Sequence, residues 1–168
     1  DVRLLWDDQR LYVLAEVTDD HLDDSHSNAW EQDSVEFFVD PTNAKSGAYN
    51  PVDGQYRVSF ENAVSISGEA PVQDRLTSAT SVTDTGYLVE VAVDLGYEPG
   101  PGQLVGLELQ VNDATDGARN SVRTWSDPTG RSYQSTSRWG VARLVDSEPV
   151  CDVSVDGSHR GPLVIDEG

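Results

Sequence analysis

Three side chains with complementary hydrogen-bonding groups lie in three separate stretches of the sequence that alternate like β-strands. Glu36 lies in "SVEFFVD", Arg57 in "QYRVSF" and Gln110 in "LELQVNDA". In each stretch the apolar residues occupy the other phase of the alternation, so the polar side chain leaves the opposite face of its strand. If these strands are neighbours, a carboxylate, a guanidinium and an amide project together from one sheet surface.

This combination suits a sugar, because vicinal hydroxyl groups each donate and accept hydrogen bonds. Aromatic rings beside such a lattice would cover the apolar C–H faces of the sugar. The candidates are Trp30, which comes just before one strand, and Tyr133, in the loop "DPTGRSYQST". The alternative is that Glu36 and Arg57 form an ordinary cross-strand pair on the surface, worth roughly a few tenths of a kcal/mol.

A second candidate site is the acidic segment "TDDHLDDSHSN", which offers hard oxygen ligands from Asp19 to Asn28, with Asp33 close behind. Calcium takes roughly six to eight such oxygens, so calcium is the metal that this segment suggests. The spacing matches no EF-hand loop. A solvated acidic loop is the alternative.

Alternation with a period of two runs through most of the chain and predicts the strands that must position these residues. Two strands surround the turn 7–9, a hairpin turns at 84–86, and no segment shows a helical period. Many short strands between Gly, Pro, Asp and Asn turns predict an all-β, antiparallel, jelly-roll-like sandwich, with a closed barrel as alternative. We assign residues 1–146 to this domain and 147–168 to a tail, linker or extra edge segment.

The remaining aromatic and sulfur-containing side chains fit structural roles better than chemical ones. Trp6 shares a strand face with apolar neighbours and Trp139 begins the last predicted strand, so both are predicted to be core, whereas Trp125 fits either role. Arg119 lies in a polar stretch where arginine is usually solvated. Cys151 is the single cysteine, which excludes a disulfide within the chain and leaves a free thiol or a bond to another part of a parent protein.

The charge of the chain restricts its partners. Thirty acidic residues face 11 basic ones, which gives a net charge of −19. Such a surface repels polyanions, so nucleic acid and anionic membranes are poor partners. No stretch has the length of a membrane span. The chain begins at Asp1 within a strand-like pattern, so we expect a piece of a longer precursor, which leaves a removed secretion signal open.

Several enzyme classes lack their motifs. The sequence has no phosphate-binding GxxxxGK[ST], no GxGxxG after a strand, no HExxH and no GxSxG. The three histidines lie in polar surroundings away from any plausible nucleophile. A pair of carboxylates for glycoside hydrolysis stays possible among thirty acids, although a small sandwich has limited material for a cleft.

The blocks "NAWEQDSVEFFVD", "GQYRV", "LQVNDA" and "TWSDPTGRSY" together resemble the family-nine carbohydrate-binding modules that are appended to secreted xylanases. The resemblance runs from about residue 2 to 145. It implies an all-β sandwich that carries structural calcium and binds glucose-type and xylose-type sugars at the reducing ends of chains, with two aromatic side chains around the terminal ring.

Carried over position by position, the resemblance implies a ligand-binding set and a metal site. Trp30 matches one aromatic wall, and Tyr133 stands where the second wall is typically tryptophan. Glu36 matches the carboxylate that binds ring hydroxyls, while Arg57, Gln110 and Arg119 match its polar partners. The family's calcium ligands map best at Asp19 and Asp33.

Two departures from the family pattern bear on the site and the fold. A family asparagine that contacts the sugar falls at Gly130, which cannot replace its side-chain hydrogen bonds, so affinity or sugar preference is expected to differ. These modules also begin with a segment, holding an Asp-Gly and a tryptophan, that is absent ahead of the first strand here. The tail "PLVIDEG" resembles such an opening segment.

We therefore interpret the chain as a non-catalytic, extracellular carbohydrate-binding module of a glycoside hydrolase, most simply an endo-1,4-β-xylanase. Its partners would be the reducing ends of cellulose, xylan or their oligosaccharides in the plant cell wall. The alternatives are a glycoside hydrolase domain in its own right and a sandwich that docks another protein. A haem-binding sandwich typically needs a methionine ligand, and the chain has no methionine.

Overall fold

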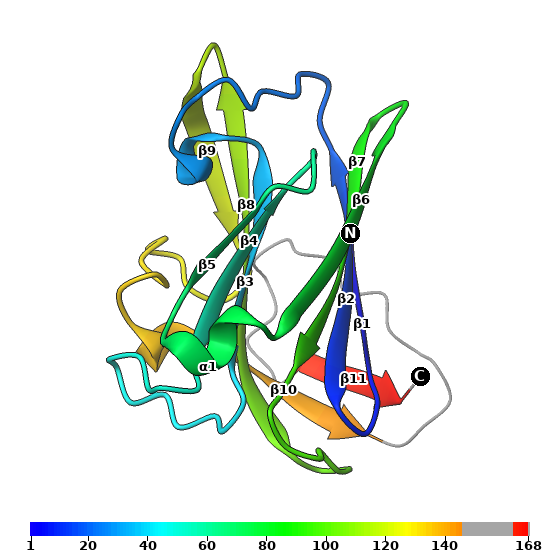
Figure 1. Ribbon diagram of the computed structural model, residues 1–168, viewed down its shortest axis with the longest axis vertical. Coiled ribbons are helices and arrows are strands. Elements are labelled where there is room, and N and C mark those ends of the chain that lie inside the picture. The colour runs from blue at the N-terminus through cyan, green and yellow to red at the C-terminus, as the bar shows by residue number, and fades with distance from the viewer. Residues whose placement is uncertain (146–162, 168) are drawn as a thin grey trace.

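The computed structural model describes residues 1–145 and 163–167, in which eleven strands form a two-layered sandwich (Figure 1). The prediction of an all-β sandwich is confirmed. One layer contains β3 (Ser34–Asp40), β4 (Gly54–Ser59), β5 (Val64–Ser67), β8 (Leu104–Thr115) and β9 (Ala118–Thr124). The other contains β1 (Val2–Trp6), β2 (Arg10–Thr18), β6 (Leu76–Thr83) and β7 (Gly86–Asp94).

The two layers belong to one hydrogen-bonded path, which runs β5-β4-β3-β8-β10-β11-β1-β2-β7-β6 with β9 beside β8. β10 (Gly140–Val145) and β11 (Leu163–Glu167) lie between β8 and β1 on this path. Every pairing in the described part of the chain is antiparallel except the two of β11, which runs parallel to β10 and to β1. Residues 146–162, including Cys151, lie outside the described residues.

Helical structure in the described residues is limited to three short pieces, so none of it could cross a membrane. They are the 3-10 turn η1 (Ala29–Glu31), the single α-helical turn α1 (Ala70–Gln73) and the 3-10 turn η2 (Thr136–Arg138).

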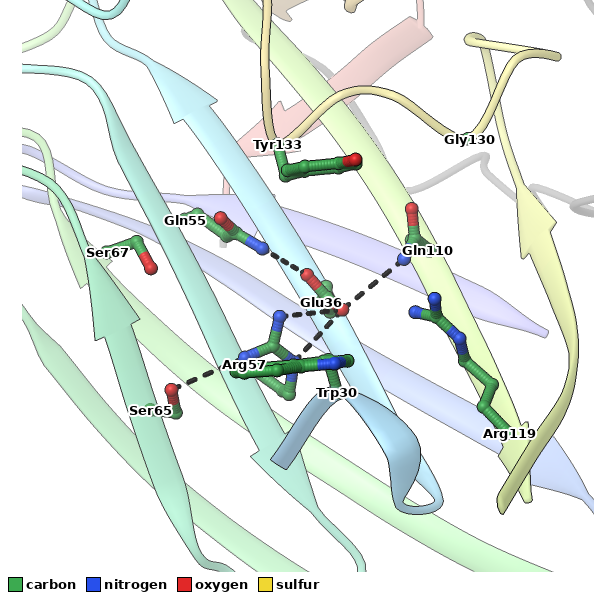
Figure 2. Close-up of a pocket in the computed structure, with 10 residues that line it drawn as sticks. All are labelled: Trp30, Glu36, Gln55, Arg57, Ser65, Ser67, Gln110, Arg119, Gly130 and Tyr133. Carbon is green, nitrogen blue, oxygen red and sulfur yellow. Dashed lines mark hydrogen bonds and ion pairs between the residues drawn. The ribbon is translucent and has the colours of Figure 1, made fainter. Parts of the chain in front are cut away.

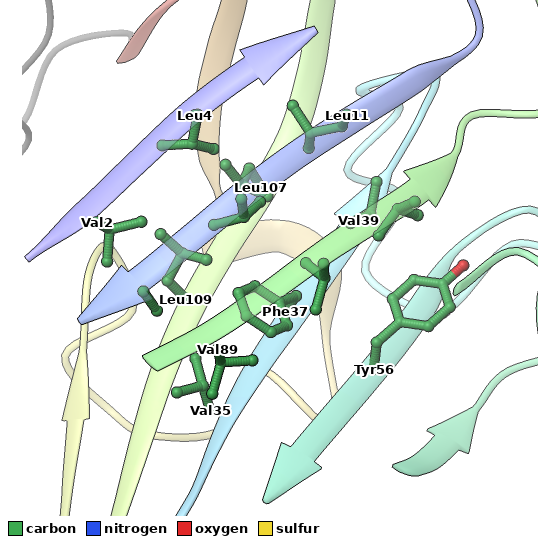
Figure 3. Packing of buried hydrophobic residues seen from close by; sticks show 14 of the residues in the cluster. Val2, Leu4, Leu11, Val35, Phe37, Val39, Tyr56, Val89, Leu107 and Leu109 are labelled. Carbon is green, nitrogen blue, oxygen red and sulfur yellow. The ribbon is translucent and has the colours of Figure 1, made fainter. Parts of the chain in front are cut away.

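The hydrophobic core fills the space between the layers because strand alternation sends one phase of each strand inward (Figure 3). On β3 the inward phase is Val35, Phe37 and Val39, each at most 1% exposed. They meet side chains of the other layer such as Leu11 and Val89. The phase predicted from the sequence for β3 is therefore correct.

The outer face of β3 is also buried, which is unusual for an antiparallel sheet. Figure 1 shows the reason: η1, the 41–53 segment and the 125–139 segment lie on this side of the layer. The face beneath them is mostly polar, so burial there requires internal hydrogen bonds. Its buried polar side chains on the central strands are Ser34, Glu36, Asp40, Gln55, Arg57, Ser59, Glu108, Gln110 and Asn112.

Three of the four tryptophans are buried, at two different places. Trp6 and Trp125 belong to the core between the layers, which confirms the prediction for Trp6. Trp139 is fully buried, but on the outer face, where its ring packs against Phe38 at 5.6 Å and Tyr49 at 5.3 Å between ring centroids. It supports the covering segments rather than the inter-layer core.

Candidate functional site

A pocket of about 420 Å³ opens on the outer face of the β3–β4–β8 layer, and all six side chains predicted to bind ligand line it (Figure 2). Its volume is in the range of small-molecule sites, ~300–1,000 Å³. The residues come from five parts of the chain: η1, β3, β4, β8–β9 and the segment after β9. The predicted lining residues are Trp30, Glu36, Arg57, Gln110, Arg119 and Tyr133.

Strand register explains why the three polar residues of the floor meet. Glu36 on β3 is paired directly with Arg57 on β4 and with Gln110 on β8. Directly opposed residues in an antiparallel pair point to the same face, with side chains close enough to interact. The three strands that carry Glu36, Arg57 and Gln110 are therefore neighbours, as the predicted convergence of these side chains requires.

The Glu36 carboxylate is the centre of the floor. Its Oε1 atom accepts hydrogen bonds from Arg57 Nε at 3.0 Å and Asn112 Nδ2 at 2.7 Å, and Arg57 Nη2 lies 3.0 Å away. Gln110 Nε2 donates to the same oxygen at 3.3 Å, and Gln55 Nε2 donates to Oε2. The lattice fixes the orientation of every member before any ligand arrives.

The Glu36–Arg57 pair is not the solvated surface pair that the sequence left open. The side chains are 1% and 8% exposed. Removing two charges from water costs several kcal/mol per ion, a cost that their attraction offsets only with good geometry and further hydrogen bonds. A buried pair under a pocket is therefore poor evidence of a stabilising role and better evidence of a site.

Two aromatic rings stand on opposite sides of this floor. Trp30, on η1, is 46% exposed, and Tyr133, in the segment between β9 and β10, is 55% exposed. Figure 2 shows the rings edge-on, with Glu36 between them. Large aromatic side chains left open beside a cavity mark a surface built for a ligand.

The pocket also contains groups that the sequence analysis did not select. Gln55 precedes Arg57 by two residues and shares its face, so strand phase alone could have found it. Ser65 and Ser67 lie on β5, a strand that the sequence analysis did not separate from β4; Ser65 Oγ accepts a hydrogen bond from Arg57 Nη1 at 3.3 Å.

Gly130, the departure from the family pattern, lines the same pocket. Its φ of +64° is in the left-handed region that favours glycine, and no atom lies within 4 Å of where a Cβ would be. The position therefore leaves open space above the floor.

The acidic residues Asp19, Asp33 and Asp113 form a separate cluster at the ends of β2, β3 and β8. One carboxylate oxygen from each lies within 4.8 Å of the others. Asp33 is fully buried, and burial, together with the charges of Asp19 and Asp113, raises its pKa to about 6 although two backbone N–H groups hydrogen-bond to it. Asp113 was not selected from the sequence, although it lies in the quoted block "LQVNDA".

Comparison with known proteins identifies the class to which this fold and pocket belong. The sequence model of the "Carbohydrate family 9 binding domain-like" family matches residues 1–147. The chain therefore belongs to this family of non-catalytic carbohydrate-binding modules.

Relatives and solved structures agree with that assignment. The chain is 46% identical over 140 residues to endo-1,4-beta-xylanase A of Thermoanaerobacterium saccharolyticum and 46% identical over 140 residues to exoglucanase XynX of Acetivibrio thermocellus. The alignments cover 82% of this chain but only 12% and 13% of those proteins. A family 9 module from Caldicellulosiruptor kristjanssonii, solved with glucose and with cellotriose, is similar at a TM-score of 0.82 in both, with 34% and 33% identity. These matches cover 89% and 90% of this chain and 78% of that one.

Proposed function

We propose that this module binds the terminal sugar unit of β-linked glucose or xylose chains between Trp30 and Tyr133, with the Glu36 lattice below the ring. The observation that carries the proposal is the pocket itself: two exposed rings flank a buried, fully oriented set of hydrogen-bonding groups. The related module solved with glucose and with cellotriose supports a glucose-type ligand.

The floor has groups left over for a ligand. Gln110 Oε1 is buried and has no hydrogen-bond partner in the described part of the chain, so it can accept a bond from a sugar hydroxyl. Arg119 Nη1 donates to Asn112 Oδ1 at 3.0 Å, and the guanidinium has further N–H groups to donate. A hydroxyl that both donates and accepts can use both kinds of group at once.

Recognition of the reducing end would follow if the anomeric hydroxyl lies among these groups. The decisive experiment is calorimetric titration with cellobiose and with its borohydride-reduced form, in which the terminal ring is open. We expect binding to cellobiose and none to the reduced form. Equal binding of both would contradict end recognition while leaving sugar binding intact.

We further propose that the parent protein is a secreted glycoside hydrolase, as the names of the relatives suggest, with the module holding it on the plant cell wall. Anchoring raises the local substrate concentration, so micromolar to millimolar affinity, roughly −8 to −4 kcal/mol, is sufficient. The acidic surface is compatible with this role because cellulose is neutral. Loss of xylan or cellulose binding by the parent enzyme after deletion of the module would test it.

Calcium is the proposed metal at Asp19, Asp33 and Asp113. Three carboxylates that converge within 4.8 Å repel one another, and one of them is fully buried; a divalent cation with hard oxygen ligands relieves both costs. The metal would hold the ends of β2, β3 and β8 together, close to the start of the strand that carries Glu36. Isothermal titration calorimetry with calcium would test the site, and the substitution Asp113→Asn should weaken calcium binding.

A further inference from the structure

Glu108 is a fully buried carboxylate that lies outside the sugar pocket. It is on β8, two residues before Gln110 and on the same outer face, opposite Phe38 of β3. Its Oε1 atom accepts backbone hydrogen bonds from Trp125 at 2.8 Å and Ser126 at 2.9 Å. Its Oε2 atom accepts from Ser126 at 3.1 Å and Asp127 at 2.8 Å.

Among the described residues, no cationic side chain forms an ion pair with Glu108. Burial raises the pKa of Glu108 to about 7, and only backbone N–H groups, those of Leu109, Trp125, Ser126 and Asp127, act in the other direction. Burying a carboxylate in this way is costly. An apolar side chain at this position would leave the N–H groups of Ser126 and Asp127 without an acceptor. The Trp125 N–H would keep its second acceptor, the Leu109 carbonyl at 3.0 Å. The carboxylate therefore fixes this backbone rather than serving the core.

The fixed backbone begins the segment that carries the Tyr133 ring. The Asp127 carboxylate accepts hydrogen bonds from Thr129 Oγ1 at 2.6 Å and Ser132 Oγ at 3.1 Å. The Ser132 carbonyl in turn accepts from Trp139 Nε1 at 3.2 Å. Tyr133 follows directly and is 55% exposed, so its place over the pocket is set by this backbone more than by packing of its own ring.

We propose that Glu108 is a positioning residue of the sugar site, which through the 125–132 backbone places Tyr133 opposite Trp30. The inference rests on the proposed role of Tyr133 in the pocket. It adds to that role a buried carboxylate that holds one wall in place.

The amide variant Glu108→Gln tests this arrangement because it keeps the shape of the side chain. Its NH₂ group is a donor where backbone donors already point, so at least one N–H of the 125–127 backbone loses its acceptor. The segment that carries Tyr133 then loses part of its anchor, and the affinity for sugar falls.

The charged groups around Glu108 are occupied elsewhere. On β3 the flanking residues of the same face are Glu36, paired with Arg57, and Asp40, which accepts hydrogen bonds from the backbone of Thr42 and Lys45. The Asp127 carboxylate points to its own turn, and the Arg138 side chain is exposed. None of these groups accepts a hydrogen bond from the N–H groups of residues 125–127.

The test measures cellobiose affinity of the full chain by calorimetry at pH 8.5, for the native protein, Glu108→Gln and the matched control Glu90→Gln. Glu90 is exposed on β7 in the other layer. We expect the Kd of Glu108→Gln to be at least about threefold that of the native protein, because its amide presents a donor to backbone donors, and the control to be native-like. A native-like Kd for Glu108→Gln would overturn the inference.

A second measurement needs no sugar. Amide and tyrosine-ring NMR signals of the native protein and of Glu108→Gln are compared under the same conditions. We expect the amides of residues 125–127 and the Tyr133 ring to shift in the variant, and the amides of β1 and β2 in the other layer to stay unchanged. If the signals of 125–127 and Tyr133 do not shift, Glu108 does not position the segment; if they shift but the native protein binds no sugar, the positioning holds and the proposed function fails.

Discussion

Replacing Glu36 by glutamine should destabilise the fold and abolish sugar binding together. The substitution keeps the shape of the side chain but removes its charge, and an NH₂ group takes the place of one oxygen. That NH₂ would point at Arg57, Asn112 and Gln110, or at Gln55, all of which donate to Glu36. Arg57, whose side chain is only 8% exposed, would keep its charge without a counter-ion.

The size of the effect follows from that exposure. Removing one partner of a buried ion pair costs about 3–5 kcal/mol because the other charge remains uncompensated. For a domain of this size, 1 kcal/mol corresponds to roughly 2–4 °C in Tm, so the Tm should fall by about 6–20 °C. Arg57→Met alone should cost a similar amount. In the double variant no charge is left unpaired, so its loss should be smaller than the sum by about 0.5–3 kcal/mol.

Urea unfolding followed by tryptophan fluorescence would measure these changes, with cellobiose calorimetry on the same samples. Glu90→Gln, which also removes a glutamate charge but at an exposed position, is the control and should change the free energy of unfolding by less than about 0.5 kcal/mol. A loss below about 1 kcal/mol for Glu36→Gln, with additive effects in the double variant, would show that the lattice does not hold a buried charge pair.

Three further predictions concern the wall, the metal cluster and the packing behind the pocket. Trp30→Ala should raise the Kd for cellobiose at least about tenfold with little change in Tm, because the ring is exposed in the free protein; Leu5→Ala, which shortens an exposed apolar side chain elsewhere, should change neither. In EDTA, the buried Asp33 carboxyl is tolerated best when it is protonated. The free energy of unfolding should therefore be higher, by at most about 3 kcal/mol, below the ordinary pKa of 3.8, and this gain should be lost as the pH rises through about 6. Calcium needs the ionised carboxylate, so it should raise the Tm more at pH 7 than at pH 5; equal increments would argue against Asp33 as a ligand. Gly140→Ala should cost about 1–3 kcal/mol in urea unfolding, because a Cβ there would come within 2.2 Å of the Trp125 ring; Gly100→Ala, whose Cβ would meet no atom closer than 3.9 Å, should be nearly neutral.

The inner and outer phases of the central strands could be predicted from the sequence because side chains alternate with a strict period of two. Val35, Phe37 and Val39 had to share one face, and Glu36 the other, whatever the strands packed against. The same rule selects Arg57 and Gln110. Their convergence needed strand order, which depends on pairings between residues as distant as 36 and 110 and leaves no local signal.

Burial of the outer face was decided by the tertiary structure alone. A strand of alternating polar and apolar residues usually has one solvent-exposed face. Nothing in "SVEFFVD" indicates that the 41–53 and 125–139 segments cover its polar face. Their cover turns a surface pair into a buried charge lattice and gives Glu108 its raised pKa. The pairing of β8 with β3, another long-range contact, brings Asp113 to Asp33 and Asp19. Local sequence determined which way each side chain points; the distant segments that exclude water determined what each side chain meets there, because solvent exclusion is a property of the assembled layers and not of any strand.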